Sequence, residues 1–229
     1  MTIAENIARI RANMAAAARE AGRDPKEILL VGASKMNDAA ACREAVAAGI
    51  DALGENRVQE MVQKLEQHAY DGAPLHFIGH LQRNKVKQVV GHVALIQSVG
   101  SLELLDEIEK VAAARGLVQD ILLEVNIGRE AAKSGFAPEK VLPAAEAALE
   151  RTHVRVRGLM TIPPADAQRD ANFRYFQEVQ ALYVDMNQKL FHNELEYLSM
   201  GMSGDYEDAI RAGATMVRVG SAIFGARHY

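Results

Sequence analysis

The feature that most constrains the fold is a regular alternation of short apolar runs with longer helical patterns. Strands are predicted at eight places, residues 28–34, 51–55, 75–79, 93–98, 120–126, 155–161, 195–201 and 215–220. Strict strand–helix alternation implies parallel pairing, and eight such units close a barrel. We therefore predict a single-domain α/β protein over residues 1–229, a (β/α)8 TIM-type barrel. An open doubly wound sheet is the alternative.

Helical patterns fill the spaces between these strands. They are predicted at residues 37–49, 56–68, 81–90, 101–116, 138–150, 170–190 and 205–213. A further amphipathic helix at residues 3–21 precedes the first strand, because its isoleucines recur at helical spacing. Gly49, Gly116 and Gly213 end three of the helices, which predicts left-handed C-caps there.

Composition and charge exclude several classes of protein. Of the 229 residues, 49% are hydrophobic, which is enough for a large core. The formal net charge is -4 and no long basic run occurs, so a nucleic-acid or anionic-membrane surface is disfavoured. The single cysteine, Cys42, excludes an intramolecular disulfide and is expected to be a packed, inert thiol. With no secretory signal and no bilayer-length apolar stretch, we expect a cytoplasmic protein.

A lysine follows the first predicted strand, in the stretch ILLVGASKMND at residues 28–38. In a parallel barrel, Lys35 would stand at the carboxyl end of that strand, where such barrels build their active sites. Partial desolvation there would lower the lysine pKa and leave more free amine to attack a carbonyl, which is Schiff-base chemistry. The alternative is a lysine that simply extends into solvent, and on a lone strand that reading is favoured.

The loop after the seventh strand has the composition of an anion site. In LSMGMSGDYEDAI, residues 198–210, two glycines bracket Met202 and Ser203, and Asp205 opens a helical pattern. Glycines let backbone amides approach an anion, and the serine hydroxyl adds a donor. A phosphate would fit here. The alternative is an ordinary turn in which Ser203 or Asp205 caps the helix.

The loop after the eighth strand has a similar composition. In MVRVGSAIFG, residues 216–225, a strand is followed by Gly220 and Ser221. Phosphate sites in these barrels are frequently built from the loops after strands seven and eight, so the two loops together indicate more than either alone. Arg218, inside the last strand, needs a partner such as a ring nitrogen or a carboxylate.

Several segments together resemble the YggS/PROSC family of pyridoxal phosphate homeostasis proteins. They cover nearly the whole chain in order: ASK, GENRVQE, HFIGHLQRNKVK, LLEVNIGREAAKSGF, GLMTIPP, LSMGMSGDYEDAI and GATMVRVGSAIFG. The resemblance implies a barrel similar to the N-terminal domain of alanine racemase, with pyridoxal 5'-phosphate (PLP) as the cofactor.

The resemblance also assigns roles to particular residues. It implies that Lys35 carries PLP as an internal aldimine and that Arg218 faces the pyridine nitrogen. It implies that the phosphate is held by Ser203, Gly204, Gly220 and Ser221, and that Asn56 lines the same mouth. A permanently charged arginine disfavours a proton on the ring nitrogen, which weakens the ring as an electron sink. No catalytic residue is predicted.

Three functions follow as candidates. The first, implied by the resemblance, is PLP homeostasis without strong catalysis, because we expect no second domain after Tyr229 to supply a tyrosine base. The second is a PLP-dependent amino-acid racemase of low activity. The third is a cofactor-free Schiff-base aldolase, whose acid-base residue is unassigned among Glu55, Glu124 and His80. Whether PLP is delivered to apo-enzymes stays open, and we expect a monomer.

Two other clusters are given ordinary interpretations. His76 and His80 are four apart in HFIGH, but on a strand their rings would lie about 13 Å apart, so no metal site is predicted. Arg83, Lys85 and Lys87 are expected to form a solvated helix face rather than an anion-binding or partner surface.

Overall fold

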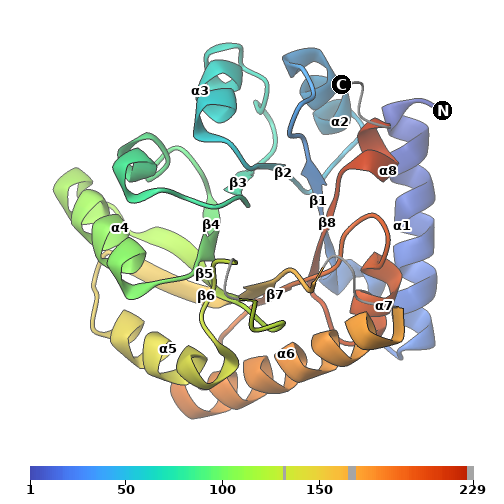
Figure 1. Ribbon diagram of the computed structural model, residues 1–229. Coiled ribbons are helices and arrows are strands. Elements are labelled where there is room, and N and C mark those ends of the chain that lie inside the picture. The colour runs from blue at the N-terminus through green and yellow to red at the C-terminus, as the bar shows by residue number, and fades with distance from the viewer. Residues whose placement is uncertain (131–132, 165–168, 226–229) are drawn as a thin grey trace.

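The computed structural model is a closed parallel barrel surrounded by helices (Figure 1). The structure describes residues 1–130, 133–164 and 169–225. Within these residues the strands are β1 (Leu29–Ala33), β2 (Ala52–Glu55), β3 (Leu75–Phe77), β4 (Leu95–Val99), β5 (Gln119–Val125), β6 (Val154–Thr161), β7 (Tyr197–Ser199) and β8 (Met216–Val219). They pair in chain order, and β8 pairs with β1. The barrel prediction is confirmed, and the open-sheet alternative is wrong because the first and last strands are hydrogen-bonded.

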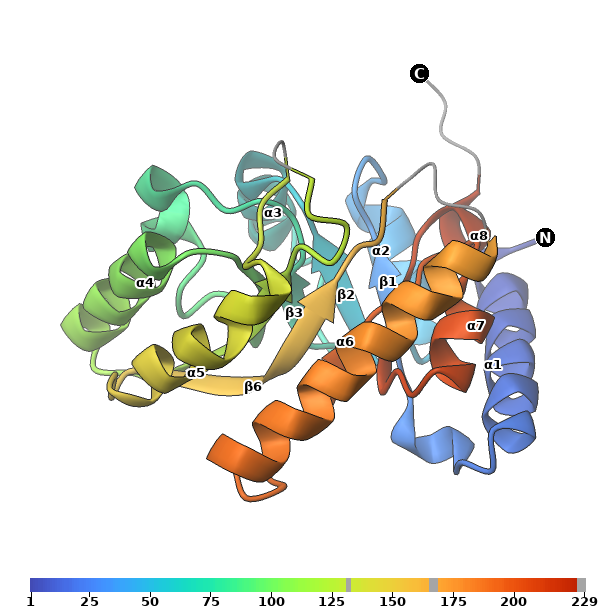
Figure 2. The same cartoon turned by 60° about the horizontal axis from the view of Figure 1, so that its bottom comes forward.

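The helices lie outside this barrel. They are α1 (Ile3–Glu20), α2 (Ala39–Ala47), α3 (Val58–Glu66), α4 (Leu102–Arg115), α5 (Val141–Leu149), α6 (Arg169–Leu190), α7 (Tyr206–Arg211) and α8 (Ser221–Phe224), with 3-10 helices η1 (Pro25–Glu27), η2 (Arg83–Gln88) and η3 (Pro138–Lys140). Figure 2 shows the long α6 crossing the front of the barrel. No helix in the described part of the chain is long and apolar enough to cross a membrane.

The added N-terminal helix is confirmed as α1. Thr2 caps it, since its hydroxyl accepts from the Glu5 N–H while the Glu5 carboxylate accepts from the Thr2 N–H. The apolar face of α1 packs beside α7 and α8 (Figure 1). The Asn6 amide donates to the Ile223 carbonyl at 2.8 Å. Helix α1 is thereby joined to α8.

The segment predicted as a helix at residues 81–90 is a 3-10 helix over Arg83–Gln88 instead. Val86 is its buried residue, and Val89 and Val90 are buried in the turn that follows it. Valine has a low α-helix propensity, which disfavours an α-helix over this segment. The predicted left-handed glycines are confirmed, with φ of 79°, 64° and 110° at Gly49, Gly116 and Gly213.

The interior of the barrel has an apolar layer and a polar layer. The apolar layer is formed by Val31, Ala52, Leu95, Leu122, Met160 and Met216. The inward-facing position two residues later along a strand is often polar, as at Gln97 on β4 and Arg218 on β8. This polar layer lies toward the carboxyl ends of the strands, so the barrel mouth is lined by groups that can bind a ligand.

Some residues named in the sequence analysis lie outside the described part of the chain. These are Ala131 and Ala132, in the segment GREAAKSGF, and Tyr229. The expectations attached to them stay predictions.

Candidate functional site

A cavity of about 480 Å³ opens at the barrel mouth, where β1 and β8 end. Its walls include six of the seven residues predicted to bind PLP, namely Lys35, Ser203, Gly204, Arg218, Gly220 and Ser221. These residues are far apart in the sequence. They meet because β8 is hydrogen-bonded to both β1 and β7, so the loops that follow these three strands are neighbours.

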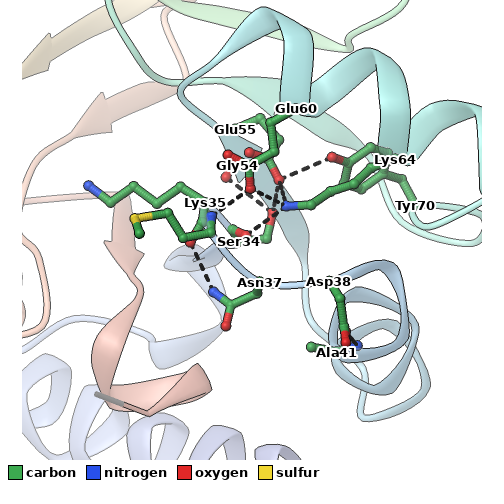
Figure 3. Close-up of polar contacts among 11 residues, drawn as sticks. Ser34, Lys35, Asn37, Asp38, Ala41, Gly54, Glu55, Glu60, Lys64 and Tyr70 are labelled. Atoms are coloured by element: carbon green, nitrogen blue, oxygen red, sulfur yellow. Dashed lines mark hydrogen bonds and ion pairs between the residues drawn. The ribbon is translucent and has the colours of Figure 1, made fainter. Parts of the chain in front are cut away.

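Lys35 follows β1 after one intervening residue, Ser34. Its side chain is half-buried and lines the cavity. The Asn37 amide donates to the Lys35 carbonyl at 3.0 Å and holds the start of the next loop. Figure 3 shows the Lys35 side chain extended away from a buried polar cluster that contains Glu55 and Lys64.

The loops after β7 and β8 are joined by Ser203. Its Oγ accepts from the backbone N–H groups of Gly220 at 3.2 Å and Ala222 at 3.4 Å. A Cβ at position 220 would stand 3.2 Å from the Ala33 carbonyl oxygen, which is tighter than ordinary contact, so a small residue suits this position. The result is a compact group of a hydroxyl and backbone donors, which is the donor set that a phosphate prefers.

Arg218 is almost wholly buried, with 3% of its surface exposed. Its guanidinium donates to Ser199 Oγ at 2.6 Å and to the Thr161 carbonyl at 2.9 Å. These two neutral groups are its hydrogen-bond partners within the described part of the chain, and a role facing the ring nitrogen of PLP stays a prediction. Burial lowers the pKa of Arg218 to about 10, while Glu124 and Asp205 raise it, so the guanidinium stays charged at neutral pH.

A hydrogen-bond chain runs from Arg218 through the barrel interior. Because the guanidinium can only donate, the Ser199 hydroxyl must donate onward to Gln97 Oε1, at 2.6 Å. The amide nitrogen of Gln97 is then directed at His76 Nδ1, at 3.0 Å. His76 must accept through Nδ1 and is therefore neutral. Burial agrees with this direction, since it lowers the pKa of His76 to about 4.

Asn56 is the predicted site residue that does not line the cavity. It follows β2 directly, at the same end of the barrel. A Cβ on Gly79 would stand 2.3 Å from the Asn56 carbonyl oxygen, so the backbones after β2 and β3 are in close contact. Among the described residues, the buried Oδ1 of Asn56 accepts no hydrogen bond. Its predicted role stays a prediction.

A buried ionic cluster beside Lys35 was missed by the sequence analysis. Glu55 Oε1 accepts from Lys64 Nζ at 2.6 Å, from Ser34 Oγ at 2.6 Å and from the Tyr70 hydroxyl at 3.1 Å. Burial and the nearby Glu55 raise the pKa of Tyr70, so its phenol stays protonated. One signal was available, since Lys64 lies on the same helix face as the apolar Met61 and four residues after Glu60.

The remaining candidates take no part in this cavity. His76 is buried inside the barrel and His80 is exposed, and no group of three or more His, Cys, Asp or Glu side chains in the described ranges could hold a metal ion. Arg83 and Lys87 are exposed, as expected of a solvated face. Cys42 is fully buried, and burial raises the pKa of its thiol, which confirms a packed cysteine.

Comparison with known proteins agrees with this geometry. Residues 6–228 match the family described as alanine racemase, N-terminal domain. The chain is 42% identical to the pyridoxal phosphate homeostasis protein of Pseudomonas aeruginosa over 228 residues, covering 100% of this chain and 97% of the relative. It is 42% identical to that of Aquifex aeolicus over 229 residues, covering 100% of both.

A solved structure extends the likeness to three dimensions. It is that of PipY from Synechococcus elongatus PCC7942 with PLP bound. The two chains superpose with a TM-score of 0.85 at 31% identity, covering 98% of this chain and 100% of PipY. By full-length sequence identity and by fold, this chain belongs to the family of pyridoxal phosphate homeostasis proteins.

Proposed function

We propose that this protein binds PLP in the cavity at the barrel mouth and holds it in a releasable form, so that it buffers the free cofactor. One observation carries the proposal: a strand-end lysine, two serine–glycine loops and a buried arginine line a single cavity. A lysine amine, a set of phosphate donors and a ring-facing cation are the groups that PLP requires.

Different residues would bind different parts of PLP. PLP supplies an aldehyde that an amine can hold covalently, together with an electron-withdrawing ring. Lys35 would provide the amine. Ser203, Gly204, Gly220 and Ser221 would hold the phosphate, since the hydroxyl and backbone donors of these loops already converge. Asn56, whose buried oxygen accepts no hydrogen bond from the described residues, would contribute from the neighbouring edge of the mouth.

The lining of the cavity favours holding the cofactor over transforming it. Arg218 keeps its charge at neutral pH and would disfavour a proton on the ring nitrogen. Among the described residues that line the cavity, none is an aspartate, glutamate, histidine, tyrosine or cysteine. Racemisation requires a second proton donor on the far face of the cofactor, and a sugar aldolase requires an acid-base group beside its lysine. The described part of the lining offers neither class of group.

The test is a visible absorption spectrum of the purified protein with PLP, recorded before and after borohydride. We expect a yellow protein whose band is lost on reduction, with the label recovered on the peptide that contains Lys35. Lys35→Ala should take up no covalent label, and Lys26→Ala, at an exposed lysine, should behave as the wild type. A wild type that stays colourless with added PLP would refute the proposal.

Catalysis is tested separately. The carrier proposal predicts that the α-hydrogen of added amino acids does not exchange with solvent deuterium at a rate above that of free PLP. Sustained exchange that is lost in Lys35→Ala would instead identify a weak racemase.

We also propose that the protein acts as a monomer and passes PLP to PLP-dependent apo-enzymes. Its mass in solution should match one chain. The PLP-loaded protein should reactivate a PLP-dependent apo-enzyme faster than free PLP does, when the free PLP is supplied at the concentration that the loaded protein releases at equilibrium. Equal rates would show that transfer runs through free PLP.

A further inference from the structure

The ammonium group of Lys64 is buried next to the backbone that carries Lys35. The Lys64 side chain is 6% exposed. Its Nζ donates to Glu55 Oε1 at 2.6 Å, to Glu60 Oε1 at 2.7 Å and to the Ser34 carbonyl at 2.8 Å. An ammonium has three hydrogens, so all of its donor capacity is used. One of the three hydrogen bonds goes to the peptide group that joins Ser34 to Lys35 (Figure 3).

The peptide group that joins Lys35 to Met36 is held by Glu60, which also pairs with Lys64. Glu60 Oε1, which accepts from Lys64, also accepts from the Met36 backbone N–H at 2.5 Å. Met36 has a φ of 63°, a left-handed conformation that a residue with an unbranched apolar side chain rarely adopts. An external hydrogen bond to its N–H therefore accompanies a backbone conformation that Met36 does not favour by itself.

This arrangement is costly if its purpose is stability alone. Burial would lower the pKa of Lys64, but Glu55 and Glu60 raise it above its ordinary value, so the lysine stays charged. The second oxygen of Glu55 is buried without a hydrogen-bond partner among the described residues. Apolar side chains of similar size often stabilise a protein as well as a buried ion pair does. The burial of Lys64 with Glu55 and Glu60 is better explained by the two peptide groups that Lys64 and Glu60 hold.

We propose that Lys64 and Glu60 are positioning residues for Lys35. They hold the peptide groups on both sides of the Lys35 Cα and so direct its side chain into the cavity. The inference rests on the proposed attachment of PLP to Lys35. It makes attachment at Lys35, in the loop after β1, depend on α3, a helix whose residues do not line the cavity.

The first test compares Glu60→Ala and Glu60→Gln with Glu66→Ala, a control at an exposed glutamate on the same helix. The readouts are the rate of borohydride-trappable PLP attachment and the midpoint of thermal unfolding. Glu60→Ala removes the acceptor for the Met36 N–H, so attachment should slow by roughly tenfold or more at temperatures well below unfolding. The glutamine oxygen still accepts this hydrogen bond, so Glu60→Gln should lie closer to the wild type. Glu66→Ala should match it.

The outcomes separate positioning from simple stabilisation. If Glu60→Ala attaches PLP at the wild-type rate, the inference is wrong. If the alanine and glutamine variants are equally slow, the charge of Glu60 matters rather than its hydrogen bond to Met36, which also contradicts the inference. If the wild type itself shows no trappable attachment, the proposed function fails first, and that result is distinct from both.

A second variant tests the positioning role of Lys64. Lys64→Met alone would leave Glu55 buried without its cation, and the protein could fail to fold. The double variant Lys64→Met/Glu55→Leu removes the two most buried charges and keeps the volume similar, and it leaves the partly exposed Glu60 to accept from the Met36 N–H. We expect this variant to fold and to attach PLP roughly tenfold more slowly, because the Ser34 carbonyl loses its donor. A folded double variant with the wild-type rate would overturn the assignment of Lys64.

Discussion

Lowering the pH from 7 to 5 should destabilise this protein through His76. The ring is buried and its Nδ1 faces the amide hydrogens of Gln97. The amide of Gln97 cannot exchange the places of its oxygen and nitrogen, because its oxygen accepts from Ser199, whose own oxygen accepts from Arg218. Arg218 stays protonated over this pH range. If Nδ1 of His76 gained a proton, its N–H would face the N–H of the Gln97 amide, so two donors would meet in the barrel interior without an acceptor between them.

The size of the effect follows from the shift in pKa. In the unfolded chain His76 titrates near 6.5, and in the folded protein burial lowers its pKa to about 4. The folded state then binds its proton less readily, so stability is present above pH 6.5 and is lost as the pH falls toward 4. At about 1.4 kcal/mol for each pH unit, the full loss is about 3 kcal/mol. Between pH 7 and pH 5 the same relation gives about 2 kcal/mol.

Urea unfolding at the two pH values measures this directly. The wild type should lose about 2 kcal/mol more between pH 7 and pH 5 than His76→Gln, whose amide can accept from Gln97 but cannot titrate. His92→Gln, at an exposed histidine, should show the wild-type dependence. If His76→Gln and the wild type lose equal stability over this range, the argument from the hydrogen-bond chain is refuted.

Two further predictions concern packing. Gly158 in β6 has a φ of 150°, and a Cβ there would stand 1.7 Å from the Tyr197 carbonyl oxygen. Gly158→Ala should therefore lower the free energy of unfolding, measured in urea, by at least about 4 kcal/mol. The control Gly22→Ala, at φ 69° with open space around it, should lower it by only about 1 kcal/mol, and equal losses in the two variants would show that the clash is absent. Cys42 is fully buried, so a thiol reagent should react with it only as the protein opens, far more slowly than in urea. Immediate reaction in the native protein would contradict this burial.

Much of the fold could be predicted because it depends on local patterns. Apolar runs and helical spacing predicted the eight described strands and the helices α1 to α7, and glycine positions predicted the ends of three helices. The short α8 was not predicted. The segment around Val86 could not be assigned correctly, because α and 3-10 helices share similar apolar spacings over so few residues.

The candidate site could likewise be predicted only in part. The positions of Lys35 and of the serine–glycine loops at the cavity were predictable, because each closely follows a strand and the barrel brings neighbouring strand ends together. Arg218 was predicted at an inward position, but its partners were not, since Ser199 and Thr161 reach it only through the barrel interior. Lys64 was missed because its partner Glu55 comes from another element, and helix periodicity alone does not report a contact between elements.

The pairing of β1 with β8 has a consequence during synthesis. Lys35 is translated well before Arg218, Gly220 and Ser221, although β1 and β8 are neighbours in the barrel. At typical bacterial or eukaryotic rates of translation, the interval is on the order of ten to forty seconds. Throughout this interval the Lys35 amine is present without the β8 loop that we propose holds the phosphate. The proposed PLP site is therefore complete only once β8 pairs with β1 and closes the barrel.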